Sequence, residues 1–131
     1  MKILIMTCVI ILFVCSGCGH QCLELKQVSG KKNTFELDNL LGRITSVTVL
    51  ETSWTNPNQD PLNYVWRIDN TSWLTGTGMT FRITVPEIPN GFVQVFPKPP
   101  EHFQLLKGQL YEVLVYYSSG VAPAGFRWVA E

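Results

Sequence analysis

The sequence has no excess of either charge: ten lysines and arginines balance ten aspartates and glutamates. Proteins that bind nucleic acids use a basic excess to neutralise phosphates, so we expect no nucleic-acid partner. Histidine is scarce, with two copies, His20 and His102. Neither stands in a zinc motif, because His20 and Cys22 have no third ligand nearby in the sequence. We therefore expect neither a metal nor a cofactor.

Catalytic motifs are missing as well. The chain contains no Gly-x-Ser-x-Gly sequence and no glycine-rich loop of the kind that cradles phosphate. The fold could still pair His102 with a serine and an acid. It could also bring carboxylates together across strands as in glycosidases, the candidates being Glu51, Asp60, Asp69 and Glu87. We interpret these groups as solvent-facing and expect that the protein is not an enzyme.

The N-terminus carries the features of a signal peptide. Lys2 supplies a positive charge, and an apolar run follows from Ile3 to Val14. A run of this length suits a signal peptide and is too short to cross a membrane as a helix. Small residues come next, and we predict a signal peptide over residues 1–17.

The segment Val14-Cys15-Ser16-Gly17-Cys18 resembles the bacterial lipobox, whose usual form is Leu-Ser/Ala-Gly/Ala-Cys, with Cys15 in place of leucine. The resemblance implies that Cys18 is the lipidation site, carries palmitate-type acyl chains and anchors the protein in the lipid bilayer. Two or three acyl chains anchor a protein durably. Gly19 replaces the aspartate that retains such lipoproteins in the inner membrane, which implies the periplasmic side of the outer membrane. The alternative is an ordinary secretory signal.

Four cysteines leave no pair for an internal disulfide. Cys8 and Cys15 depart with the signal peptide, and lipid consumes Cys18. Only Cys22 remains, so the mature domain must be stabilised by its core. We predict a tether over residues 18–32, in which the alternation around Leu25 could start a short strand, and a single domain over residues 33–131.

Alternation of apolar and polar residues dominates that domain and predicts strands. Asn90-Gly91 suits a tight hairpin turn, so we predict that residues 92–96 pair back on the strand before them. The predicted strands cover residues 34–40, 44–52, 62–69, 79–85, 92–96, 110–117 and 126–129. Several short strands with regular turns favour an all-β fold, a small antiparallel β-sandwich, with an up-and-down barrel as the alternative.

A local motif supports the sandwich. Residues 105–115 read Leu-x-x-Gly-x-x-Tyr-x-Val-x-Val. This pattern resembles the tyrosine corner of fibronectin type III and other immunoglobulin-like domains, with Lys107 where proline is frequent. The resemblance implies that the Tyr111 ring is buried and that its hydroxyl bonds to backbone a few residues upstream.

The tryptophans fall into two groups. Trp66 and Trp128 lie in alternating strands and are expected in the core. Trp54 and Trp73 stand at strand ends; we favour a capping role for Trp73. Trp54 leads into a loop with two prolines, and such a rigid aromatic site can anchor a protein partner or fold back to cap the sandwich. The predicted partner-binding residues are Trp54, Asn56, Asn58 and Asp60.

The whole layout resembles small enterobacterial lipoproteins regarded as periplasmic immunity proteins of type VI secretion. That resemblance is one of architecture: a lipobox, a tether and a β-rich domain. It implies a protein-binding module that neutralises a toxin in the periplasm. The alternatives are a structural outer-membrane lipoprotein of a secretion or envelope complex, and a periplasmic enzyme.

Overall fold

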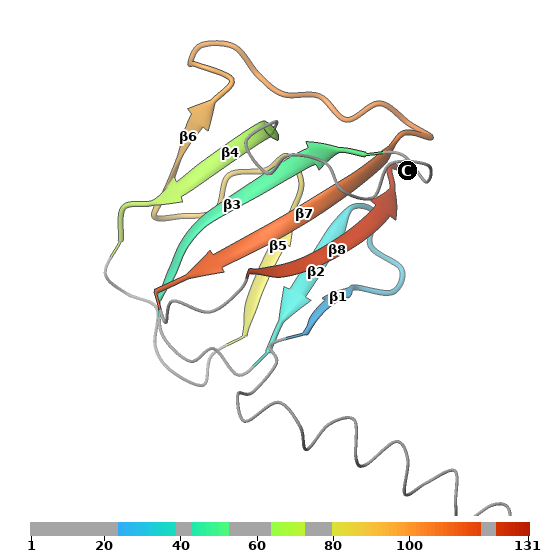
Figure 1. Cartoon of the computed structure of the whole chain (residues 1–131), viewed down its shortest axis with the longest axis horizontal. Helices are drawn as coiled ribbons and strands as arrows, with labels where there is room; N and C mark the ends of the chain where they lie inside the picture. The colour runs from blue at the N-terminus through green and yellow to red at the C-terminus, as the bar shows by residue number, and fades with distance from the viewer. Residues whose placement is uncertain (1–23, 39–42, 53–63, 73–79, 119–122) are drawn as a thin grey trace, which may run out of the picture.

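The computed structural model describes residues 24–38, 43–52, 64–72, 80–118 and 123–131. This part of the chain is all-β and contains eight strands (Figure 1). The strands are β1 Leu25–Gln27, β2 Thr34–Leu37, β3 Ile44–Glu51, β4 Tyr64–Asn70, β5 Phe81–Thr84, β6 Phe92–Phe96, β7 Leu110–Tyr117 and β8 Ala124–Val129.

The strands form two antiparallel sheets, one of three strands in the order β1-β2-β5 and one of five in the order β6-β4-β3-β7-β8. In Figure 1 the larger sheet lies across the front and β5 passes behind β3 and β7. Apolar residues of both sheets meet in one core. The predicted β-sandwich is therefore confirmed, and the barrel alternative is not formed by the described strands.

The core forms because each strand alternates its side chains between the two faces of its sheet. Trp66 and Trp128 are both buried there, as the sequence predicted. The ring of Phe35, from the small sheet, meets Trp128 edge-on with centroids 4.7 Å apart. Aromatic contacts of this geometry join the two layers and add to the stabilisation from buried area.

Several strand boundaries differ from the sequence prediction; β2, for example, ends at Leu37 and not at position 40. β8 begins at Ala124, two residues before the predicted position 126. β1 lies within the segment expected to be the tether, where a short strand around Leu25 was also foreseen. Leu25 is buried in the core, so the ordered sheet extends upstream of residue 33.

The predicted hairpin at Asn90-Gly91 is wrong. β5 pairs with β2 in the small sheet, whereas β6 pairs with β4 in the large one. A type I′ hairpin needs positive φ at both central residues. Here Gly91 has a φ of 85° and Asn90 is not in that region, and the Phe92 N–H donates to the Pro89 carbonyl over 3.1 Å. The turn instead redirects the chain between the layers, where Phe81 and Phe92 pack with ring centroids 5.7 Å apart.

The tyrosine corner is confirmed. The Tyr111 ring is fully buried, and its hydroxyl accepts a hydrogen bond of 3.0 Å from the Leu106 backbone N–H. Gly108, with a φ of 85°, provides the sharp entry into β7, since other residues rarely adopt this conformation. Phe103 packs edge-on against the Tyr111 ring, with centroids 6.0 Å apart.

Replacing Tyr111 by phenylalanine should lower the free energy of unfolding by about 1 to 3 kcal/mol. The ring would stay in place, but the Leu106 N–H would lose its acceptor. Urea denaturation of both proteins measures the difference. An unchanged midpoint at equal slope would contradict the assigned role of this hydroxyl.

Asn33 joins the start of the small sheet to the end of the large one. Its side-chain oxygen accepts hydrogen bonds from Trp128 Nε1 over 2.9 Å and from the Glu131 backbone N–H over 3.2 Å. Its Nδ2 donates to the Glu131 carbonyl over 3.3 Å. Asn33 also has a φ of 51°, the left-handed region that asparagine tolerates better than most residues. Asn33 thus adopts the backbone conformation of the turn after β1 and also accepts the hydrogen bond of the buried Trp128 indole.

Candidate protein-binding surface

The residues predicted to make the functional contacts lie outside the described part of the chain. These are the lipidation site Cys18 and the four loop residues Trp54, Asn56, Asn58 and Asp60. Trp73, expected to cap the sandwich, also lies outside it. Their roles stay predictions, and the site below is built from described residues alone.

Strand β6 exposes an unusual amount of apolar side chain. Val93, Val95 and Phe96 are 48%, 42% and 44% exposed, respectively. The strand is the edge of the five-stranded sheet, next to β4. Large apolar side chains that gather on one strand at a sheet edge are a mark of an interaction surface, whereas single ones are not.

A bulge sets the orientation of these side chains. Gln94 lies opposite Ile68 and Phe96 opposite Arg67, so β6 holds one extra residue, Val95, between them. The Gln94 amide donates to the carbonyls of Pro97 and Glu101 over 2.8 and 2.7 Å, which fixes the chain after the strand. A bulge bends and twists its strand. The bulge at Val95 turns Phe96 to the outer face of the sheet, next to β4.

The neighbouring residues of β4 give this apolar strand a polar border. Tyr64 meets Phe96 edge-on, with ring centroids 5.5 Å apart. The Arg67 guanidinium lies 5.8 Å from the centre of the Tyr64 ring and donates to the Asp69 carboxylate over 2.9 Å. Both charged side chains are about one-third exposed. The hydrogen bond to Asp69 raises the pKa of Arg67, so the guanidinium stays charged.

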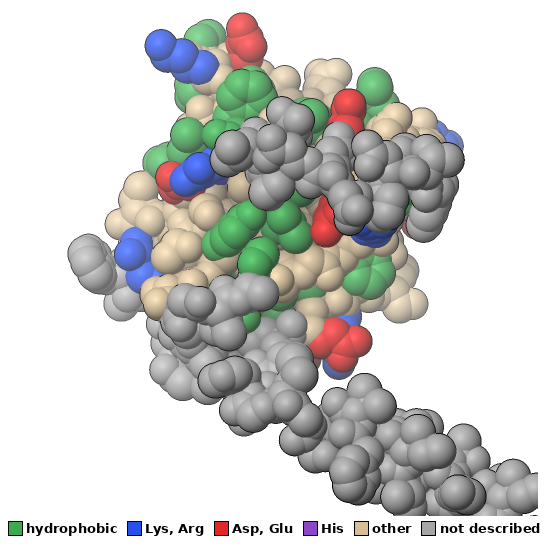
Figure 2. All heavy atoms as spheres, in the orientation of Figure 1, with side chains coloured by type: hydrophobic (Ala, Val, Ile, Leu, Met, Phe, Trp, Pro, Cys, Tyr) green, Lys and Arg blue, Asp and Glu red, His purple; other side chains and the backbone are tan. Residues whose placement is uncertain are grey.

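We call this set of side chains the β6–β4 surface, comprising Tyr64, Arg67, Asp69, Val93, Val95 and Phe96. Figure 2 views the face of the large sheet on which it lies, with apolar side chains beside charged ones. Tyrosine and arginine next to an apolar centre are the residue types enriched in protein interfaces. The arrangement is suited to binding a protein by shape and apolar contact, with the ion pair at its border.

Sequence reasoning missed this surface because it treated residues 92–96 as one strand among several. The available signal was the composition Phe-Val-Gln-Val-Phe, which has no charged residue, directly before a proline-rich segment. Strands at sheet edges normally carry a charge or a proline. Position at the edge, however, depends on pairing with β4, which is distant in sequence.

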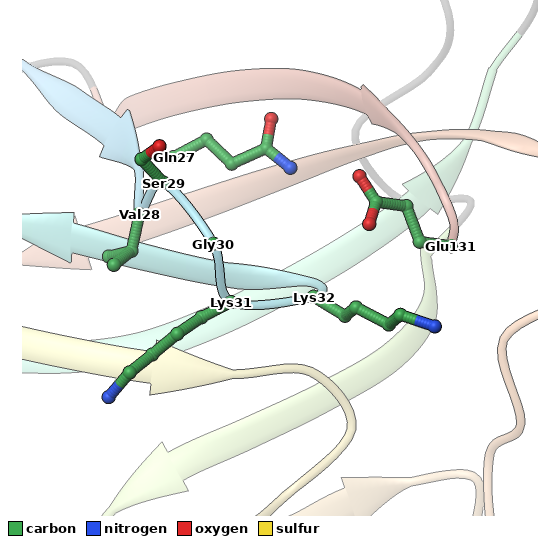
Figure 3. A pocket seen from close by; sticks show the side chains of 7 residues that line it. All are labelled: Gln27, Val28, Ser29, Gly30, Lys31, Lys32 and Glu131. Carbon is green, nitrogen blue, oxygen red and sulfur yellow. The ribbon is translucent and has the colours of Figure 1, made fainter.

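An open depression lies at the turn between β1 and β2, near the C-terminus (Figure 3). Its volume is about 470 Å³, and the described lining residues include Ser29, Lys31, Lys32 and Glu131. In this view the Lys32 side chain extends from the turn toward the side where Glu131 lies, whereas Lys31 points the opposite way. The depression is open and is lined by side chains of both charges. Its described lining residues do not place a nucleophile beside a base.

Four of the candidate catalytic groups lie in the part of the chain that the structure describes. His102, Glu51 and Glu87 are exposed, and Asp69 is paired with Arg67. Asp60 lies outside the described residues. Within residues 24–38, 43–52, 64–72, 80–118 and 123–131, no three histidine, cysteine or acidic side chains come close enough to hold a metal.

The described ranges also contain no helix with the length and apolar character needed to cross a bilayer. Comparison of the chain with models of protein families, with curated proteins and with solved structures gives no match. The N-terminal motif and the β6–β4 surface are therefore the two features of the chain that indicate a function.

Proposed function

We propose that this chain is a lipoprotein anchored through Cys18 on the periplasmic side of the bacterial outer membrane, and that its β-sandwich binds another protein. The lipobox-like sequence before Cys18 supports the anchor. The β6–β4 surface supports the binding, and it is the observation that carries the proposal. The protein acts by binding and not by turnover, so catalysis on a cell-wall or lipid substrate by the purified chain would contradict it.

The β6–β4 surface is favourable for binding because it is already assembled. The Tyr64 ring is in contact with both Phe96 and Arg67, and Arg67 is held by Asp69. A preformed contact surface loses less side-chain entropy when a partner docks. The predicted contact residues Trp54, Asn56, Asn58 and Asp60 belong to the segment that precedes β4 in the sequence.

The most specific form of this function is immunity, in which the protein binds a toxin and blocks it. An inhibitor fixed to the membrane would meet a toxin where type VI secretion delivers it, and it would block the toxin by covering its active surface. The second candidate is a structural lipoprotein of a secretion or envelope complex, for which the same exposed surface would be an assembly contact. A toxin gene beside the gene for this chain supports the first, and a complete secretion operon supports the second.

Replacing Cys18 by serine should abolish incorporation of labelled palmitate and leave the precursor uncleaved by the lipoprotein peptidase, because serine offers no thiol to acylate. Labelling of cells that express each protein measures both effects. The matched control is Cys22→Ser, which removes the other cysteine of the mature chain and should be processed normally. Normal processing and membrane retention of the Cys18→Ser protein would contradict the anchor.

A further inference from the structure

The chain that follows β6 projects from one end of the sandwich. In Figure 1 it leaves the upper end of β6 and forms the uppermost part of the described chain, whereas β1 begins at the lower end. We call residues 97–101, Pro-Lys-Pro-Pro-Glu, the proline bend. Lys98, Pro99, Pro100 and Glu101 are all exposed, so another protein can reach the bend from several sides.

Hydrogen bonds hold the proline bend in one shape. The Glu101 backbone N–H donates to the Lys98 carbonyl over 3.1 Å, which closes a turn with two prolines at its centre. The Gln94 amide donates to the carbonyls of Pro97 and Glu101, which are the two ends of the bend. Proline rings restrict the backbone further. The bend therefore loses little conformational entropy when a partner encloses it.

The proline bend folds around the end of β6 and lies on both of its sides. Gln94 is opposite the buried Ile68, so its side chain points to the core face of the sheet. Because this side chain binds the Glu101 carbonyl, Glu101 lies on that side of β6. Phe96 is opposite Arg67 and lies on the outer face. A partner that contacts both Phe96 and Glu101 therefore has to surround the bend.

The composition of the proline bend indicates the kind of partner that it fits. Projecting loops insert into concave sites, and proline-rich segments bind in grooves lined by aromatic side chains. Val95 and Phe96 add exposed apolar surface directly before the prolines. Lys98 and Glu101 carry opposite charges, so the bend has no net charge and does not require a charged cleft. We propose that the proline bend inserts into an apolar, aromatic-lined cleft of the protein partner.

The position of the bend agrees with the anchor at Cys18. Leu25, the first residue of β1, follows Cys18 by seven residues, which span at most about 25 Å. The anchor thus holds the lower end of the sandwich in Figure 1 near the bilayer, and the bend at the upper end is free to reach a protein. The inference rests on the proposed function, since it specifies the shape and chemistry of the partner that the β6–β4 surface binds.

The test places a photoreactive phenylalanine analogue at position 96, 99 or 101 of the full chain in living cells. We expect adducts of one protein mass from all three positions, because a cleft encloses both sides of the bend. The control position, Leu106, is 62% exposed and lies beyond the bend, so it should give none. Adducts from position 96 alone would overturn the cleft but keep the proposed binding, since a flat partner contacts the outer face only. No adduct from any of the three positions would contradict both.

Two variants, each probed from position 96, test the chemistry of the cleft. Changing Pro99 and Pro100 together to serine removes both rings and should lower the adduct yield at least about fivefold. Lys98→Ala removes the neighbouring positive charge and should leave the yield unchanged. A loss with Lys98→Ala as large as that with the serine variant would overturn the apolar cleft in favour of an acidic one.

A third variant tests the fixed shape of the bend. Gln94→Leu removes the two hydrogen bonds that hold the bend and should lower the adduct yield from position 99. The matched control is Gln109→Leu, which removes an amide that donates to the carbonyls of Thr52 and Leu110 outside the bend. The melting transition of each protein, followed by circular dichroism, checks that the domain stays folded. Equal yields from the two folded variants would contradict insertion of a preformed bend.

Discussion

Replacing Trp66 by alanine is expected to lower the free energy of unfolding by about 3 to 5 kcal/mol. Trp66 is among the largest side chains that are fully buried, and it lies opposite Val49 in the centre of the large sheet. Removal of its ring would leave a cavity between the two layers. Urea denaturation followed by circular dichroism measures the loss, which is a large part of the total stability of a domain of this size.

Trp66→Phe is the matched variant that separates the ring from its N–H group. The Trp66 indole nitrogen is buried and has no hydrogen-bond partner among the described residues. Phenylalanine keeps most of the apolar contact and removes this unsatisfied donor, so we expect roughly half of the alanine loss or less. Equal losses for the two variants would mean that the indole nitrogen is satisfied.

Replacing Asn33 by alanine is expected to lower the free energy of unfolding by about 2 to 4 kcal/mol, from two effects. The buried Trp128 Nε1–H and the Glu131 N–H would lose the oxygen that accepts from both. Alanine would also be strained at the φ of 51° that asparagine tolerates. The measurement is again urea denaturation, and a loss below about 1 kcal/mol would contradict this account of Asn33.

Two further variants separate the contribution of the hydrogen bonds from that of the backbone strain at Asn33. Asn33→Gly removes the hydrogen bonds without the backbone strain, so it should lose less stability than Asn33→Ala. Trp128→Phe removes the indole donor, and a double-mutant cycle with Asn33→Gly should give a coupling energy of about 0.5 to 3 kcal/mol. Strict additivity would mean that the hydrogen bond between Asn33 and Trp128 contributes nothing to stability.

Local patterns predicted much of the fold because they report on local chemistry. The alternation of residues 110–117 coincides with β7, and the spacing of Gly108 and Tyr111 foretold a buried ring with a backbone partner. Trp66 was expected in the core from the apolar residues two positions away on either side. In each case the decisive information lies within about ten residues of sequence.

The failures arose where distant residues decide the structure. Asn90-Gly91 permits a hairpin, but burial of Phe81 and Phe92 from different sheets outweighs that local preference. The role of Asn33 depends on Trp128, almost a hundred positions along the chain. The β6–β4 surface depends in the same way on pairing between distant strands. A strand without charged residues forms an exposed apolar surface of this kind only when it lies at a sheet edge.

We propose that the anchored sandwich binds a protein through the β6–β4 surface. The most direct test places a photoreactive phenylalanine analogue at Phe96 of the full chain in living cells. The control position is Leu106, which is 62% exposed but not part of this surface. We predict that irradiation produces a protein adduct of one defined mass from position 96, and that Tyr64→Ala reduces its yield while position 106 gives none.

Equal adducts from both positions, or none from position 96 in cells that contain the membrane-anchored protein, would contradict the claim. Where the partner is identified from the adduct, calorimetry provides the affinity. Phe96→Ala should then weaken binding by at least about 2 kcal/mol, close to thirtyfold, as expected of a residue central to an interface. Unchanged affinity with intact folding would show that the partner binds elsewhere.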